Sequence, residues 1–133
     1  MTTLEEARRF FSGDHFATEN GAVIEEIGPD HAICSMALSQ HHKNAAGRVM
    51  GGVLFTLADF AFAVAANFHQ PPAVTVSSQI TFLSPVKGTK LIARAQQLRR
   101  GRTSLYYEVT VTDELGTLAA RVTALGQIIG SCS

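Results

Sequence analysis

One long segment of the chain is apolar on almost every side. Residues 52–68 contain no proline, are rich in Leu and Ala, and carry polar side chains only at Thr56, Asp59 and Asn67. A helix that is apolar all round is typically a buried helix. The segment therefore predicts one long helix at the centre of the molecule.

The hydrophobic pattern changes to a period of two after the prolines at 71 and 72. Apolar and polar side chains alternate over 74–82, and a Ser-Pro pair closes the run, as expected for a strand. Three similar runs follow, joined by turn-forming residues, and they cover 89–98, 103–112 and 117–129. In the second of these runs, one face carries Leu105, Tyr107, Val109 and Val111. This half of the chain predicts four antiparallel strands.

The residues before the long helix predict a short helix and two strands. Thr3 followed by Glu6 resembles a capping box, and a Ser-Gly pair ends the helix. One side of this helix, which we expect to act as a lid or packing helix, carries Leu4, Ala7, Phe10 and Phe11. A Gly-Pro-Asp turn separates strands at 22–27 and 31–38, and a polar loop follows at 39–50.

These elements fit one fold of the α+β class. An antiparallel sheet, strongly twisted and wrapped around one long buried helix, satisfies their order, because nothing else in the chain could cover the helix. This is the hotdog fold. With 133 residues it predicts a single domain, 1–133, with an N-terminal helix in 1–13 and a flexible tail at 130–133. Since one curved sheet cannot cover every side of an apolar helix, we expect a second copy of the chain to bury the rest.

Composition narrows the classes of protein that fit. Hydrophobic residues make up 46% of the chain and no repeat is visible, which argues against disorder and solenoid folds. The charged start MTTLEEARRFF lacks the apolar core of a signal peptide, so we expect a cytoplasmic protein with two reduced thiols, Cys34 and Cys132. The histidines lack the spacing of a metal site, so neither a metal nor another cofactor is predicted. The central Asp59 argues against a membrane span, and no nucleic-acid partner is expected.

Charge is distributed unevenly along the chain, although the net charge is zero. Acids predominate in residues 1–30, whereas Asp59 is the lone acid in 31–102. The basic residues of that second stretch are Lys43, Arg48, Lys87, Lys90, Arg94, Arg99, Arg100 and Arg102. An anionic ligand fits this stretch, and ordinary solvated strand faces are the alternative.

Asp59 is the most unusual residue of the predicted central helix. A carboxylate in an apolar helix must be paired, hydrogen-bonded or neutralised, since an unpaired buried charge is very costly. The residues one turn away are Phe55, Thr56, Phe62 and Ala63, none of which is cationic. Asp59 is therefore either bonded to Thr56 or to backbone donors of a neighbouring strand, or it is a general base or nucleophile at the wall of a cleft.

The pair Gly51-Gly52 marks the junction between the polar loop and the helix. The first amides of a helix have no intrahelical acceptor and lie at the positive pole of its dipole. Without side chains in the way, they could polarise a carbonyl oxygen and stabilise an oxyanion. Gly51 and Asp59 are roughly 12 Å apart along one helix axis. If both act on one carbonyl, they belong to two chains paired antiparallel across a twofold axis.

Several motifs together resemble those of a known family. They are His42-Lys43-Asn44, Gly47, the run from Val49 to Asp59, the run from Phe82 to Lys87 and the run from Leu98 to Thr103. This set resembles the signature of the PaaI-like acyl-CoA thioesterases of the hotdog superfamily. The chain departs from that signature at Met50, where many relatives have His, so any proton-handling role of that His is lost.

The resemblance implies hydrolysis of an acyl-CoA substrate with an aromatic or medium-chain acyl group. Asp59 would attack the thioester carbonyl or activate water, the N–H of Gly51 would polarise the carbonyl oxygen, and Asn44 would position water or the thioester. Gly52 and Ser77 would help to position the substrate. The coenzyme A moiety would lie along Phe82, Ser84, Lys87, Arg99, Arg100, Gly101, Arg102 and Thr103.

The same interpretation implies an acyl pocket and an assembly. The pocket is expected to be shaped by Phe55, Phe60, Phe62 and Phe68. The two-chain site implies at least a homodimer, or a dimer of dimers. Two other activities compete: a hotdog module that binds acyl-CoA without turnover, as a sensor or partner subunit, and a hotdog dehydratase or hydratase. Asp59 together with Asn44 argues against the first, and the lack of a His-centred motif beside the helix argues against the second.

Overall fold

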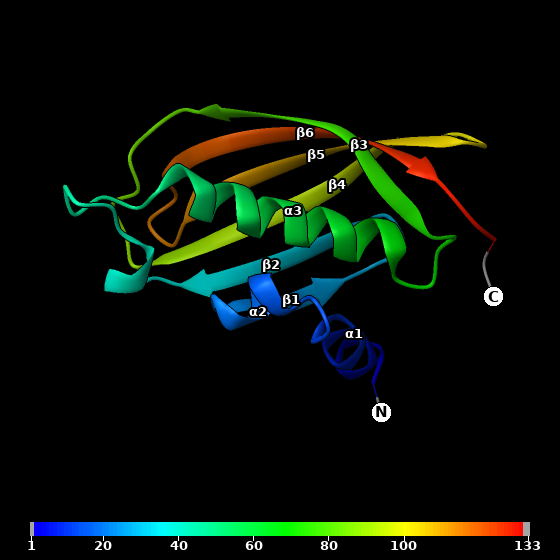
Figure 1. Cartoon of the computed structure of the whole chain (residues 1–133), viewed down its shortest axis with the longest axis horizontal. Helices are drawn as coiled ribbons and strands as arrows, with labels where there is room; N and C mark the ends of the chain where they lie inside the picture. Colours follow the sequence, from blue (N-terminus) through cyan, green and yellow to red (C-terminus); the bar gives the residue numbers. More distant parts are fainter. Residues whose placement is uncertain (1, 132–133) are drawn as a thin grey trace.

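The computed structural model describes residues 2–131, which form a six-stranded sheet curved around one long helix (Figure 1). Two short helices come first, α1 (Thr3–Phe11) and α2 (His15–Glu19), followed by strands β1 (Ala22–Ile27) and β2 (His31–Ala37). A short 3-10 helix, η1 (Gln40–His42), leads to the central helix α3 (Gly51–Asn67). The remaining strands are β3 (Ala73–Phe82), β4 (Lys90–Arg100), β5 (Ser104–Asp113) and β6 (Leu118–Ile128).

Neighbouring strands of the sheet are all antiparallel, and their order is β1-β2-β4-β5-β6-β3. This confirms the predicted α+β class and the wrapping of one sheet around one helix. Helix α3 begins and ends one residue earlier than the apolar segment 52–68, because Gly51 is already helical and Phe68 is extended. The order places β1 and β3 at the two edges of the sheet.

The core lies between α3 and the concave face of the sheet. Helix α3 contributes Leu57, Ala58, Ala61, Val64 and Ala65, each at most 1% exposed. The predicted alternation in the run 103–112 is confirmed, since the buried residues of β5 are Leu105, Tyr107, Val109, Val111 and Asp113. Each fully buried Leu or Val stabilises the fold by about 1.5–3 kcal/mol relative to an exposed one. The alanines allow α3 to lie close to the strands.

The N-terminal capping box is formed by Thr2 and Glu5, so the predicted pair Thr3 and Glu6 was wrong by one residue. Adjacent Thr residues followed by adjacent Glu residues offer two registers, and the sequence alone does not choose between them. Helix α2 was not predicted, because five residues are too few to establish a helical period.

Helix α1 packs against β1, as expected of a packing helix. Ala7 and Phe11 are buried, and Nε of Arg8 donates to the carbonyl oxygen of Ile24 at 2.8 Å. Phe10 was expected on the same apolar side, but it is 70% exposed. The buried stripe of so short a helix is only two residues wide, so Phe10 remains on the surface.

One face of α3 and one edge of the sheet are uncovered in the single chain. Gly52 and Asp59 are exposed, so one copy of the sheet leaves part of the helix uncovered, as the sequence predicts. At the edge strand β3, Val74 is 48% exposed and Val76 is 57% exposed. A bulge after Thr75 interrupts the regular alternation expected for this strand. The sheet covers only one side of the helix, so these surfaces remain exposed in the single chain.

The predicted tail 130–133 extends past the described residues. Residues 130 and 131 are in neither helix nor strand, whereas 132 and 133, and with them Cys132, lie outside the description. Cys34 is fully buried in β2, and its burial, reinforced by the charge of Glu25, raises the pKa of the thiol to about 12. Cys34 therefore stays protonated and unreactive at neutral pH.

Candidate active site

The N-terminal end of α3 presents backbone amides that have no partner among the described residues. Met50 is the N-cap residue and makes no capping side-chain hydrogen bond within residues 2–131. At this end the first bonded amide is that of Val53, which donates to the carbonyl oxygen of Met50 at 3.0 Å. The amides of Gly51 and Gly52 therefore point out of the helix at its positive pole. Such an end can polarise a carbonyl oxygen, as the sequence predicts.

The two glycines differ in the space around them. A Cβ atom on Gly51 would lie 2.8 Å from Cζ of Phe82, so a side chain there would displace the Phe82 ring. A Cβ atom on Gly52 would meet no described atom within 4 Å. A side chain at position 51 would thus need the exposed Phe82 ring to move, whereas Gly52 opens onto the uncovered face of the helix.

Asp59 lies about two turns further along α3, on the exposed face. The helical rise of 1.5 Å per residue separates it from Gly51 by about 12 Å along the axis. Desolvation by its surroundings and, second, the negative charge of Asp14 raise the pKa of Asp59. The hydroxyl of Thr56 donates to the carbonyl oxygen of Gly52 at 2.7 Å, so the alternative in which Thr56 donates to Asp59 is wrong. An accessible carboxyl with a raised pKa suits a general base.

Asn44 shapes the loop that leads into α3. Its Oδ1 atom accepts hydrogen bonds from the amides of Ala46 and Arg48, both at 3.0 Å. Gly47 follows with a φ of 81°, in the left-handed region that glycine tolerates. The side-chain oxygen of Asn44 is thus used within the loop, and its Nδ2 donor is the group left to meet a substrate.

His42 fixes the same loop to the N-terminal part of the chain, a role that sequence reasoning missed. Its ring is buried, with Nδ1 accepting from the amide of Ser39 at 3.1 Å and Nε2 donating to the carbonyl oxygen of Asn20 at 2.8 Å. The carbonyl oxygen of His42 accepts from the amide of Met50 at 3.0 Å. His42 is therefore a positioning residue for the start of α3. The spacing Ser39 to His42, which forms a capping box, was the available signal.

A cationic cleft of about 770 Å³ opens beside Gly51. Its lining includes the predicted residues Phe82, Ser84 and Lys87, together with Lys43 and Arg48, which were not among the predicted ligands. None of the described residues that line the cleft is acidic. The structure thus brings one of the two predicted coenzyme A segments to the start of α3.

Asp113 holds the loop that forms one wall of this cleft. It is only 2% exposed, and its Oδ2 atom accepts from the amides of Lys87 and Gly88 at 2.9 and 3.0 Å. Its Oδ1 atom accepts from the amides of Leu115 and Thr117 at 3.0 and 2.9 Å. Burial alone would raise the pKa of Asp113, but these backbone donors outweigh it and hold that pKa far below its usual range.

The second predicted coenzyme A segment, 99–103, lies at the opposite end of the folded molecule, away from the start of α3. The carbonyl oxygen of Thr103 accepts from the amide of Ile128 at 2.9 Å, beside the start of β3. Phe82 is at the far end of that ten-residue strand, roughly 30 Å away at about 3.3 Å per residue. Figure 1 shows the β4–β5 hairpin, in yellow, at the end where α3 finishes. The two predicted segments are therefore far apart within a single chain.

Arg100 points into the protein, against the prediction that it contacts coenzyme A. Its Nε atom donates to Oε1 of Gln97 at 2.9 Å, and Nη2 lies 3.4 Å from the carbonyl oxygen of Ala66 and 3.3 Å from the Tyr107 hydroxyl. A bulge after Gln97 changes the alternation of β4, so Arg100 is opposite the buried Leu105. The guanidinium instead meets the carbonyl end of α3, where a positive charge is favourable. Arg99, Arg102 and Thr103 remain exposed.

The predicted role of Ser77 stays open to test, whereas part of the predicted aromatic pocket is contradicted by the structure. Ser77 is exposed on β3 directly after the bulge, and its role stays a prediction. Phe60 and Phe62 are 4% and 3% exposed, and the Phe62 ring meets Tyr107 edge-on at 5.3 Å. These two rings fill the core, so the expectation that they line an open acyl pocket is wrong.

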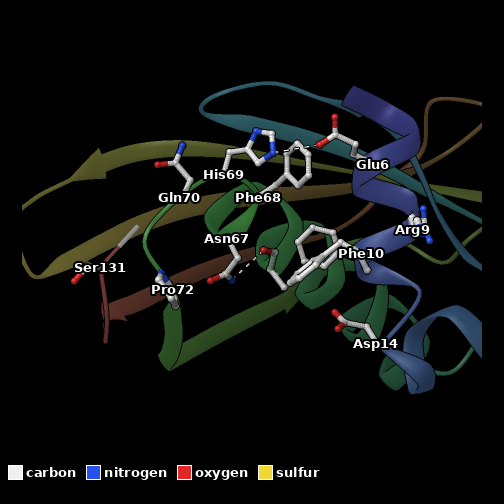
Figure 2. Close-up of a pocket in the computed structure, with 12 residues that line it drawn as sticks. Glu6, Arg9, Phe10, Asp14, Asn67, Phe68, His69, Gln70, Pro72 and Ser131 are labelled. Atoms are coloured by element: carbon white, nitrogen blue, oxygen red, sulfur yellow. Dashed lines mark hydrogen bonds and ion pairs between the residues drawn. The ribbon is translucent and has the colours of Figure 1, made fainter. Parts of the chain in front are cut away.

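A further cavity of about 870 Å³ lies between α1 and the C-terminal end of α3 (Figure 2). It continues the uncovered face of α3 beyond Asp59, and its lining includes Phe10, Asp14, Ala63, Asn67 and Phe68. Figure 2 shows Asp14 near one end of the cavity, below Phe10 and Arg9. At the other side Nε2 of His69 is 3.5 Å from Glu6.

The chain belongs to the thioesterase superfamily, because the sequence model of that family matches residues 46–120. It is 34% identical over 100 residues to a putative esterase of Archaeoglobus fulgidus, covering 74% of this chain and 65% of the relative. It is 30% identical over 111 residues to the acyl-coenzyme A thioesterase PaaI of Escherichia coli, covering 83% of this chain and 79% of the relative.

Solved structures share the same fold. The structure of E. coli PaaI has a TM-score of 0.90 at 27% identity, covering 98% of this chain and 95% of that chain. A Streptococcus mutans protein solved with bound acetyl-CoA has a TM-score of 0.78 at 26% identity, covering 83% of this chain and 90% of that chain. These similarities confirm the predicted family and the hotdog fold.

Two further observations concern membrane-spanning helices and metal sites. Within the described part of the chain, the helices are all too short or too polar to cross a membrane. Among residues 2–131, no three His, Cys, Asp or Glu side chains gather where they could hold a metal ion.

Proposed function

We propose that the chain hydrolyses an acyl-CoA thioester to a free acid and coenzyme A. The observation that carries this proposal is the pairing, on one helix, of unpartnered amides at Gly51 and Gly52 with the exposed carboxyl of Asp59, whose pKa is raised. Thioester hydrolysis needs a group that stabilises the carbonyl oxygen and a base or nucleophile. The similarity to a protein named acyl-coenzyme A thioesterase supports the substrate class.

The chemistry follows from these two groups. The Gly51 amide donates to the thioester carbonyl oxygen and stabilises the negative charge that develops on it. Ionised Asp59 takes a proton from water as the water oxygen bonds to the carbonyl carbon, or attacks that carbon itself to form an anhydride that water then cleaves. In both routes the C–S bond breaks, and the thiolate of coenzyme A leaves and takes up a proton. The Asn44 amide and the Ser77 hydroxyl position the water or the thioester.

Each site is built from two copies of the chain. Gly51 and Asp59 of one helix are about 12 Å apart along its axis, too far to act on one carbonyl. An antiparallel pairing of two α3 helices across a twofold axis brings Gly51 of one copy to Asp59 of the other. The uncovered face of α3 and the exposed apolar edge of β3 support such a pairing. We propose a homodimer, or a dimer of dimers.

Coenzyme A occupies the cationic cleft beside Gly51. Lys43, Arg48 and Lys87 line the cleft and can pair with the phosphates, and Phe82 and Ser84 complete it. The antiparallel pairing also brings the hairpin of the second copy toward this cleft. That hairpin would contribute Arg99, Gly101, Arg102 and Thr103.

A thiol-release assay over a panel of aryl and alkyl acyl-CoA esters tests this function. Asp59→Asn keeps the shape of the side chain and removes the base, so turnover should fall by about two orders of magnitude or more. Glu19→Gln is a matched control, because Glu19 is an exposed acid on α2. The proposal fails if the wild-type protein binds several esters but releases no thiol. That result would favour a hotdog module that binds acyl-CoA without turnover.

A further inference from the structure

A third and smaller cavity lies beside the start of α3, against a different face from the cationic cleft. It measures about 270 Å³ and is lined in part by Phe16, Met36, Met50, Gly52, Val53 and Thr56. Gly51 and Leu54 line the cleft, whereas Gly52, Val53 and Thr56 line this pocket. Met50 and Gly52 flank Gly51 in the chain, so the pocket lies next to the residue assigned to the thioester carbonyl, which itself lines the cleft.

The two cavities differ in chemistry. Lys43, Arg48 and Lys87 line the cleft, whereas none of the described residues around the pocket is a Lys, Arg, Asp or Glu. The lining includes Phe16 and two methionines, Met36 and Met50, whose flexible thioethers adapt to an apolar occupant.

Several polar side chains around the pocket are already bonded within the chain. The Thr56 hydroxyl donates to the carbonyl oxygen of Gly52 at 2.7 Å, and Nδ2 of Asn20 donates to the carbonyl oxygen of Phe16 at 2.8 Å. Both ring nitrogens of His42 are engaged, as described above. A polar ligand group that used these side chains would have to break these bonds. An apolar group would not.

The size of the pocket limits its occupant. An apolar cavity of about 150 Å³ holds a benzene molecule. A pocket of about 270 Å³ therefore accepts an aromatic ring with a short linker, or an alkyl chain of medium length. A long acyl chain would extend out of it into solvent.

We propose that this pocket binds the acyl group of the substrate and that Phe16 sets the length it accepts. The proposal rests on the proposed function, since it places the thioester carbonyl at Gly51, with coenzyme A in the cleft and the acyl group in the pocket. Phe16 is 73% exposed on α2, so its ring forms a wall that can be altered without disturbing the core.

The test measures binding of S-alkyl coenzyme A thioethers, from ethyl to dodecyl, which cannot be hydrolysed. In the wild-type protein, each added methylene should tighten binding by up to about fourfold until the pocket is full, after which affinity should level off. Phe16→Ala should move that plateau to longer chains, and Phe16→Trp should move it to shorter ones. Phe10→Ala is the matched control, because Phe10 is equally exposed but lines the other cavity.

The acyl-pocket proposal is overturned if both Phe16 variants, shown to be folded, keep the wild-type plateau, or if Phe10→Ala moves it as much. Because the ligands are not substrates, the outcome is independent of turnover. A plateau that shifts as expected in a protein that releases no thiol from acyl-CoA esters would retain the pocket and reject the hydrolase.

Discussion

Replacing Asp113 by Ala removes the anchor of the cleft wall. The carboxylate accepts four backbone hydrogen bonds, at 2.9 to 3.0 Å, from the loop after β3 and from the turn between β5 and β6. A hydrogen bond to a charged group contributes about 1.5–3 kcal/mol in a buried setting, but amides freed in a surface loop partly regain water. We therefore expect a loss of about 2–4 kcal/mol in the free energy of unfolding, a large share of the 5–15 kcal/mol typical of a domain.

The lowered pKa of Asp113 predicts how the loss of stability in Asp113→Ala changes with pH. The pKa of Asp113 is lower in the folded protein than in the unfolded chain. A carboxyl of this kind stabilises the fold at pH values above its unfolded pKa of about 4, and the contribution is lost as the pH falls through the folded pKa. The gap in stability between the wild type and Asp113→Ala should thus be full at neutral pH and narrow only below about pH 4.

Urea unfolding at neutral and acidic pH, with coenzyme A binding measured in parallel, tests both aspects. Asp113→Asn is the matched variant, because it keeps the size of the side chain but turns a donor toward two of the four amides. We expect weaker coenzyme A binding in both variants, since the loop of Lys87 lines the cleft. A loss below about 1 kcal/mol for Asp113→Ala at neutral pH would refute the reasoning.

Two further predictions concern the site itself. The double variant Lys43→Ala, Arg48→Ala should weaken coenzyme A binding and flatten its salt dependence in titrations. Arg100→Ala should instead lower the melting temperature and leave the affinity for coenzyme A nearly unchanged. The reverse pattern would show that Arg100 contacts the ligand. Asp14→Asn should lower the raised pKa of Asp59 and move the acidic limb of the kcat/KM profile to lower pH, because Asp14 contributes to that raised pKa. An unmoved limb, equal to that of Glu19→Gln, would contradict this coupling.

Local patterns predicted the elements of the fold well. The alternation of β5 and the apolar run of α3 report directly which side chains face the core, so their existence and type follow from period alone. The register of the first capping box could not be chosen, because Thr2 with Glu5 and Thr3 with Glu6 satisfy the same rule. Helix α2 was too short to show a period.

The candidate site was predicted only where its residues are close in sequence. The Gly51 to Asp59 spacing on one helix was sufficient to place both groups, but exposure of Asp59 depends on how far the sheet wraps around α3. The direction of Arg100 depends on a bulge in β4, which leaves no mark in the sequence. The small apolar pocket combines Phe16 of α2 with Met36 of β2, and only the folded chain brings these together.

Complementation between two inactive chains tests the central claim, a hydrolytic site shared by two copies. Asp59→Asn removes the carboxylate, and Gly51→Pro removes the amide donor at the first helical position, where proline is tolerated. Because the proline ring would press on Phe82, each variant is first checked for folding and for loss of activity. Unfolded together in equal amounts and refolded, they form mixed dimers in which one site has both native groups and the other has neither.

Thiol release from an acyl-CoA ester is then compared with that of each variant refolded alone. With random pairing and one restored site per mixed dimer, the mixture should recover roughly a quarter of wild-type activity. Mixed dimers that are verified by mass and yet release no thiol would contradict the assignment of Gly51 and Asp59 to one site across two chains.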